Sequence, residues 1–120
     1  FVGRSNLLPV HFQEDADGCH GSIQGRRIDG LSSRKSGWAR MALRYEAVRI
    51  SEADTSDPAP GAMQGVVEDV LFLGTNCEVN IRCGDLHLIG SIPAARETNL
   101  SIGQQVRLDF DLSNSQVFHD

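Results

Sequence analysis

The stretch Met63–Gly84, MQGVVEDVLFLGTNCEVNIRCG, decides the fold class of this chain. From Cys77 to Cys83 apolar and polar residues alternate without a break, which predicts a half-buried strand. The preceding run is apolar enough for a buried strand, but its alternation breaks between Val67 and Val70. We therefore expect a bulge or a sharp bend there, so that one long strand serves two parts of a closed sheet. The stretch reads as a scaffold hairpin that turns at Gly74, and none of its residues carries evident chemistry.

Similar strands follow along the chain. The pair Gly84-Asp85 predicts a tight turn into a strand over Leu86–Ile92, which Pro93 ends. Residues 94–105 form the longest connection in this half, with room for one turn of helix, and a final half-buried strand alternates from Val106 to Leu112. Val117 and Phe118 are expected to fold back onto the core. The expected core residues are Val79, Ile81, Leu88, Val106, Leu108 and Phe110, and the expected turn glycines are Gly3, Gly74, Gly84 and Gly103.

The first half of the chain is less regular in sequence. Pro9 cannot donate a ladder hydrogen bond, so residues 1–12 suit a sheet edge better than a central strand. Residues 13–37 are polar and rich in glycine, and short hairpin strands are expected near residues 20–24 and 26–29. From Trp38 onward the apolar positions change parity, which predicts a strand to Arg44, a turn at residues 45–47 and a new strand from Val48. A helix over Trp38–Ile50 is the competing interpretation, but it would lack a polar face.

Together these patterns predict an all-β protein, a small OB-fold-like closed antiparallel barrel with an irregular N-terminal β segment packed on it. Ser51–Gly61, SEADTSDPAPG, has the composition of a linker. We expect residues 1–51 to form the N-terminal β segment, 52–61 the linker and 62–120 the barrel, all within one folding unit. The chain begins without a methionine, which suggests a piece of a longer protein.

Composition argues against several classes of function. A formal charge of −5 and 6% aromatic residues do not suit a nucleic-acid-binding surface. No apolar run approaches the roughly 18 residues of a membrane-spanning helix. Three cysteines without CxxC spacing predict neither a disulfide framework nor a zinc site, so a reducing, cytoplasmic setting is the simpler interpretation. No pattern in the sequence indicates a nucleophile, a base and an orienting group that would act together, which argues against an independent enzyme.

Several phrases resemble one family. FVGRSNLLP at residues 1–9, ALRYEAVRI at 42–50, GVVEDVLFLG at 65–74, and IGQQVRL at 102–108 followed by Val117-Phe118 are similar, in order and spacing, to the TOBE (transport-associated OB) domain. This is the C-terminal regulatory domain of ATP-binding subunits of bacterial ABC importers of the spermidine/putrescine or iron type. Tyr45 stands where the family usually has proline, which loosens the expected turn. The Ser-Asn pair alone does not supply the oxyanion pocket of molybdate-binding relatives, so the resemblance does not imply that this chain binds an anion.

The resemblance implies a non-catalytic regulatory domain that packs against its counterpart in a second subunit and against the ATPase domain of its own chain. ATP and Mg²⁺ would bind only in an upstream domain, since this sequence lacks GxxxxGK[ST], and no cofactor is expected here. The parent subunit would associate with membrane permeases at the inner face of the cytoplasmic membrane, with no nucleic-acid partner and no direct membrane insertion. The open alternative is a small-ligand module for an anion, polyamine or metal; a nucleic-acid-binding OB domain ranks below it.

Residues with possible site roles each have a structural interpretation as well. Trp38 is the preferred interface anchor, with Arg40 beside it, because large amphipathic rings are enriched at buried contacts. Arg44 and Glu46 are a candidate intersubunit pair, although turn residues that pair with each other are more common. Cys19-His20 is the best-looking ligand pair, but adjacent side chains point apart and further ligands would have to come from distant histidines, His11, His87 or His119. No catalytic, cofactor or metal residue is assigned.

Overall fold

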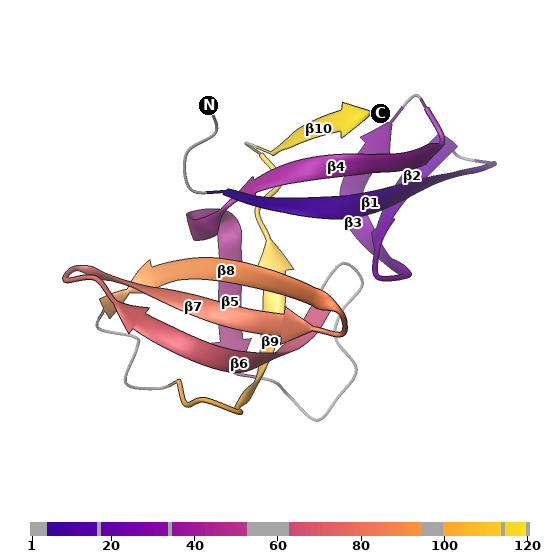
Figure 1. Cartoon of the computed structure of the whole chain (residues 1–120). Helices are drawn as coiled ribbons and strands as arrows, with labels where there is room; N and C mark the ends of the chain where they lie inside the picture. Colours follow the sequence, from indigo (N-terminus) through magenta and orange to yellow (C-terminus); the bar gives the residue numbers. More distant parts are fainter. Residues whose placement is uncertain are drawn as a thin grey trace.

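The computed structural model describes residues 5–16, 18–33, 35–52, 63–94, 100–113 and 115–119, and these form two five-stranded antiparallel sheets (Figure 1). Sheet A has the strand order β10-β4-β1-β2-β3 and sheet B the order β5-β9-β6-β7-β8. The strands of sheet A are β1 (Ser5–Asp15), β2 (Gly18–Ile23), β3 (Arg26–Ser33), β4 (Gly37–Arg44) and β10 (Gln116–His119). Those of sheet B are β5 (Val48–Glu52), β6 (Met63–Phe72), β7 (Asn76–Cys83), β8 (Leu86–Pro93) and β9 (Gln105–Phe110). The predicted all-β class is confirmed.

The β6–β7 hairpin has the predicted bend. The β6–β7 register shifts between Val67 and Asp69. The first part of β6, Met63–Val66, pairs with β9, and the part from Val66 to Phe72 pairs with β7. Gly74 has a φ of 84°, a conformation that glycine adopts without a steric penalty, so the chain reverses there. One long strand thus serves two parts of sheet B, as the broken alternation indicated.

Sheet B curls into a nearly closed barrel. Its two edge strands, β5 and β8, come together at Gly90, where an added Cβ would lie 2.9 Å from Ile50 Cδ1 and 3.4 Å from Val48 Cγ1. The glycine therefore lets the edges approach, and closure protects strand edges that would otherwise be open to pairing with other chains.

Sheet A is more regular than the sequence suggested. Three of the glycines that made residues 13–37 look irregular, Gly18, Gly25 and Gly37, lie at a turn or a strand start and have positive φ, whereas Gly21 and Gly30 lie within β2 and β3. Between them β2 and β3 run longer than the short hairpin expected, with one register shift between His20 and Ser22. The predicted N-terminal β segment is therefore present and shares a core with the barrel, and its strands are longer than the sequence suggested.

The connection between the sheets follows the predicted change of parity. β4 ends at Arg44, the 3-10 turn η1 spans Tyr45–Ala47, and β5 begins at Val48, so the helical alternative is excluded. The sheets also exchange segments across the expected boundary at residues 52–61. β5 belongs to sheet B, and β10 returns from the C-terminal half to pair with β4 in sheet A. The two halves therefore complete each other.

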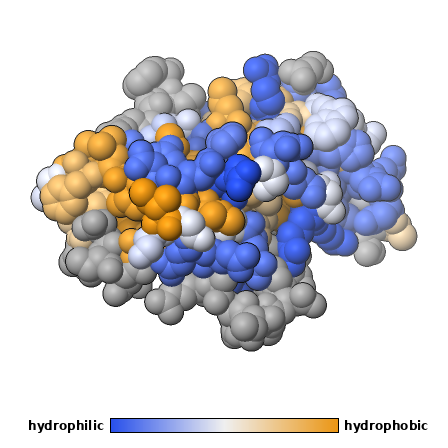
Figure 2. Space-filling view, turned by 60° about the horizontal axis from the view of Figure 1, so that its bottom comes forward, coloured by the Kyte–Doolittle hydropathy of each residue, from blue (hydrophilic) through white to orange (hydrophobic). Residues whose placement is uncertain are grey.

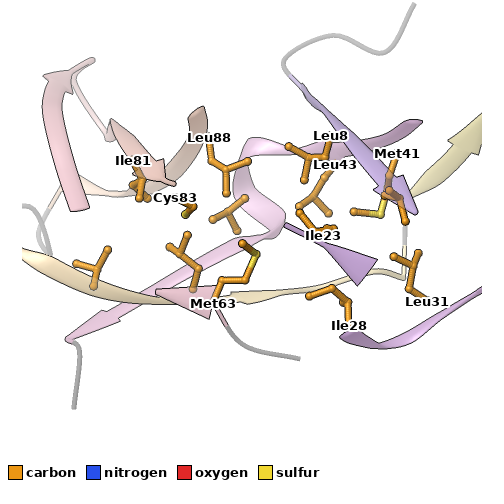
Figure 3. Packing of buried hydrophobic residues seen from close by; sticks show 14 of the residues in the cluster. Leu8, Ile23, Ile28, Leu31, Met41, Leu43, Met63, Ile81, Cys83 and Leu88 are labelled. Carbon is orange, nitrogen blue, oxygen red and sulfur yellow. The ribbon is translucent and has the colours of Figure 1, made fainter. Parts of the chain in front are cut away.

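One hydrophobic core spans both sheets (Figure 3). Leu8, Leu43 and Ile23 gather on the sheet A side, and Ile81, Cys83 and Leu88 on the sheet B side, with Met63 between them. Of the expected core residues, Val79, Ile81, Leu88, Val106 and Leu108 are fully buried, while Phe110 is partly buried against the cluster. Gly84 and Gly103 have φ of 61° and 88°, whereas Gly3 lies outside the described residues.

Candidate functional site

The outer face of sheet A presents large apolar side chains to solvent. Pro9 on β1 and Phe118 on β10 both pair with Arg40 of β4, so their side chains lie on the same face of the sheet. Leu7 is 60% exposed, Trp38 65% and Phe118 42%. We call this surface the β1–β4–β10 face; its members are Leu7, Pro9, His11, Trp38, Arg40 and Phe118.

Trp38 is held in place on this face by its cross-strand neighbour. His11 pairs with Trp38 in the β1–β4 ladder, and the two ring centroids lie 4.8 Å apart at an interplanar angle of 51°. The imidazole covers part of the indole and leaves most of its surface in water. An exposed aromatic ring of this kind is suited to an interface.

The four candidate interface residues from the sequence fall into two groups. Trp38, Arg40 and Arg44 occupy alternate positions of β4 and share its outer side. Glu46 lies on η1 and its Oε1 accepts a hydrogen bond from Arg44 Nε at 3.1 Å. Arg44 therefore already has a local partner, and the pair is exposed on both sides, where such ion pairs contribute about 1 kcal/mol at most.

Sequence reasoning missed two members of this face. Phe118 was expected to tuck onto the core with Val117, but only Val117 packs there and Phe118 points outward. Leu7 was not singled out, yet it lies between buried Asn6 and Leu8 and points to the outer face. The sequence of this segment gave no such signal, because Leu7 and Leu8 are both apolar and the buried neighbour Asn6 is polar, and Pro9 suggested a sheet edge although β1 is the central strand of sheet A.

A second apolar surface lies at the far end of the β6–β7 hairpin. Leu71, Phe72 and Leu73 are all exposed there. Figure 2 shows the apolar surface at the same end of the molecule, at the left of the view. Next to it a pocket of about 190 Å³ is lined by Tyr45, Glu46, Leu73, Asn76, Glu78 and Ser91. The lining contains two carboxylates, which makes this pocket unsuitable for an anion.

A buried asparagine joins the two sheets. The side chain of Asn6, 7% exposed, donates from Nδ2 to Ile89 O and accepts from Ile89 N, both at 2.8 Å. Its amide thus takes the place of a neighbouring strand at the β8 edge. This residue is too buried to meet a ligand, and its role is to hold β1 against β8.

The possible metal ligands lie apart. His20 Nδ1 is 3.0 Å from Arg27 Nη2, and its Nε2 is 3.4 Å from an oxygen of Asp15. His87 contacts Glu68 and His119 contacts Ser33, at separate places in the fold. Among the residues that the structure describes, no group of three or more His, Cys, Asp and Glu side chains converges on a common point. Cys19-His20 therefore gains no further ligand in this part of the chain.

The cysteines of β7 are core residues. Cys77 and Cys83 are buried and Cys19 is half-buried, and none of the three forms a disulfide. Burial raises the pKa of the Cys83 thiol to about 11. A thiol in that environment stays protonated near neutral pH and is a poor nucleophile.

Comparison with known proteins places the chain in a family. The TOBE domain family matches residues 41–118. A search of curated proteins finds no match. The solved structure of the cytoplasmic molybdate-binding protein ModG, with molybdate bound, superimposes with a TM-score of 0.76 at 12% identity, covering 98% of each chain. At that identity the likeness shows the fold alone. No helix in the described ranges is long and apolar enough to cross a membrane. Because the match spans well over half of its length, the chain belongs to the TOBE domain family.

Proposed function

We propose that this chain is the non-catalytic regulatory and dimerisation domain of the ATP-binding subunit of an ABC importer. Two copies meet through the β1–β4–β10 face, and the ATPase domain that binds ATP and Mg²⁺ precedes residue 1. The parent subunit lies at the cytoplasmic side of the membrane and contacts permease subunits. Membership of the TOBE domain family supports this assignment.

The observation that carries the proposal is the composition of the β1–β4–β10 face. Leu7, Trp38 and Phe118 expose apolar surface on one face of a sheet, and Arg40 lies among them. Tryptophan and arginine are the residues most enriched among those that dominate binding energy, and they are concentrated near the centre of an interface. A contiguous apolar surface on a sheet face is unfavourable in water, and contact with a second copy removes it from water.

Solution mass tests this proposal. We expect the isolated chain to move from monomer to dimer as its concentration rises in sedimentation equilibrium, and Trp38→Ser to weaken the dimer by at least about tenfold. Phe72→Ser is the matched control, because it removes a similarly exposed aromatic ring from the hairpin end. A monomer at every concentration would refute dimerisation through this domain. Dissociation by Phe72→Ser but not by Trp38→Ser would place the interface elsewhere.

The parent assignment has its own test. The genomic sequence upstream of residue 1 should encode a phosphate-binding loop and, after it, an LSGGQ-type signature of ABC ATPases. Their absence would remove the importer assignment while leaving the dimer proposal untouched.

A small-ligand module is the second candidate function. The fold of a protein described as molybdate-binding favours it in general terms. The pocket of about 190 Å³ beside η1 holds Glu46 and Glu78, so its chemistry favours a cation such as a polyamine over an oxyanion. A thermal shift with spermidine, absent with molybdate and reduced by Glu46→Gln, would support this candidate. Equal melting temperatures with and without spermidine would dismiss it.

A further inference from the structure

The outer face of sheet B has a pocket that neither proposed function uses. It measures about 380 Å³ and is lined by Gln64, Gly65, Val66, Arg82, Gly84 and Gln105. We propose that this pocket binds a small organic anion through a carboxylate or phosphate group held by Arg82. The site is separate from the β1–β4–β10 face, so its failure would leave the dimer proposal intact.

The strand register brings the polar side chains together. Val66 pairs with Arg82 on β7 and with Gln105 on β9, so a guanidinium and a carboxamide flank it on the same face. Gln64 lies two residues before Val66 and shares that face. Just beyond, the β6–β7 register shifts between Val67 and Asp69. A bulge of this kind increases the local twist, which helps to hollow the surface of the sheet beside it.

The lining offers donors and no carboxylate. Arg82 contributes the only formal charge among the six lining residues, and Gln64 and Gln105 each contribute an amide group with two N–H donors. The carboxylate that pairs with Arg82, Glu68, does not line the pocket; its Oε2 lies 3.7 Å from Arg82 Nε. The other oxygen of Glu68 contacts His87 Nδ1 at 2.9 Å. Glu68 is therefore shared with His87 and makes only a long contact with Arg82.

The chemistry of the lining selects the ligand class. The planar fork of a guanidinium matches the two oxygens of a carboxylate or phosphate and binds them bidentately. The side-chain amides add neutral donors, while Val66 supplies an apolar surface for a carbon skeleton. A volume of about 380 Å³ lies within the range of roughly 300–1,000 Å³ usual for small-molecule sites. An inorganic oxyanion would leave most of this space to water, so an organic body is expected.

Titration of the 120-residue chain followed by two-dimensional ¹H–¹⁵N NMR tests the site. The probes are glycerol phosphate, succinate, inorganic phosphate and neutral glycerol. We expect saturable shifts with the first two, at the backbone amides of Gly65 and Gly84 and at the side-chain amides of Gln64 and Gln105. Inorganic phosphate should bind several-fold more weakly at the same amides, and glycerol should cause no shift. Shifts that map to other surfaces, or that do not saturate with any probe, would overturn the proposal.

Three variants separate this site from general charge effects. Arg82→Gln should weaken glycerol phosphate and succinate by about tenfold, since it removes the bidentate donor. Arg49→Gln is the matched control, because Arg49 is an exposed arginine of β5 that does not line the pocket. Gln105→Glu places a carboxylate in the lining and should abolish binding of both probes. Equal losses in Arg82→Gln and Arg49→Gln, or undiminished binding in Gln105→Glu, would contradict the assignment.

Discussion

The contact between Asn6 and Ile89 makes a sharp prediction about stability. Asn6→Ala removes both hydrogen bonds that tie β1 to the edge of β8. It leaves the N–H and C=O of Ile89 without these partners, next to a cavity where the carboxamide was. A buried backbone group that loses its hydrogen bond costs roughly 1–3 kcal/mol.

The structure narrows the expected size of this effect. The two bonds are short, at 2.8 Å each, but Ile89 is only partly buried, so water reaches the freed groups in part. The longer contact of Asn6 Nδ2 with Leu43 O, 3.4 Å, adds little. We therefore expect Asn6→Ala to lower the free energy of unfolding by about 2–4 kcal/mol, a large part of the stability of a domain of this size.

Asn6→Asp adds a pH dependence that an unspecific loss of packing would not show. A carboxylate oxygen in place of Nδ2 would face Ile89 O, and burial would raise the pKa of the new carboxyl above its unfolded value of about 3.9. Once protonated, the carboxyl can donate to Ile89 O and restore the second bond. Because the folded pKa is raised, the protonated form's contribution is complete below about pH 4 and is lost as pH rises through the folded pKa.

Urea denaturation followed by tryptophan fluorescence, with the single Trp38 as probe, measures these differences. Asn80→Ala is the control, since Asn80 pairs with Ile89 in the β7–β8 ladder and its side chain has no hydrogen bond to another residue in the described part of the chain. We expect the control to change stability by less than about 0.5 kcal/mol. The reasoning fails if Asn6→Ala costs no more than Asn80→Ala, or if the deficit of Asn6→Asp stays constant between pH 7 and pH 4.

Three further predictions follow from packing and titration. Gly65→Ala should cost about 1–3 kcal/mol, because the new Cβ would lie 2.5 Å from Ile81 Cγ2 and 2.8 Å from Cys83 Sγ; the neighbouring exposed change Gln64→Ala should cost far less in the same urea titration. With a thiol reagent at pH 8, the folded chain should react quickly at Cys19 alone, since Cys77 and Cys83 are buried, whereas the chain unfolded in urea should react at all three cysteines. Rapid labelling of Cys77 or Cys83 in the folded chain would contradict their burial in the core. Hydrogen bonds from Ser113 lower the pKa of Asp111, so the stability they contribute is present above the unfolded pKa and is lost as pH falls through the folded pKa. The difference in free energy of unfolding between wild type and Ser113→Ala should therefore shrink from pH 5 to pH 2.5. A constant difference would argue against the hydrogen bond.

The elements predicted best were those with strong local patterns. The bulge of β6, the turn at η1 and the alternation of β7 all follow from the order of apolar and polar residues within one or two strands. Such patterns report which face of a strand is buried, and that information is local. They do not report which distant strand lies alongside.

The unpredicted features all depend on pairing between distant segments. β10 pairs with β4 across more than seventy residues, which turns Phe118 outward and brings it beside Arg40. Asn6 carries no structural signal in the sequence, and only the approach of β8 gives it a structural role. Arg82 and Gln105 look like ordinary solvent-facing residues until β6 lies between them. Long-range pairing of this kind leaves no trace in the spacing of residues along one strand.

The same long-range pairing links folding to the proposed interface. The β1–β4–β10 face takes its apolar side chains from three segments, two in the first half of the described chain and one at its end. The family match begins at Met41, inside β4, so Leu7 and Trp38 lie before it while Phe118 is its last residue. The TOBE region therefore supplies the barrel and one edge of the face, and the preceding segment supplies the rest. A surface assembled in this way exists only once the whole chain has folded, which would keep incomplete chains from dimerising.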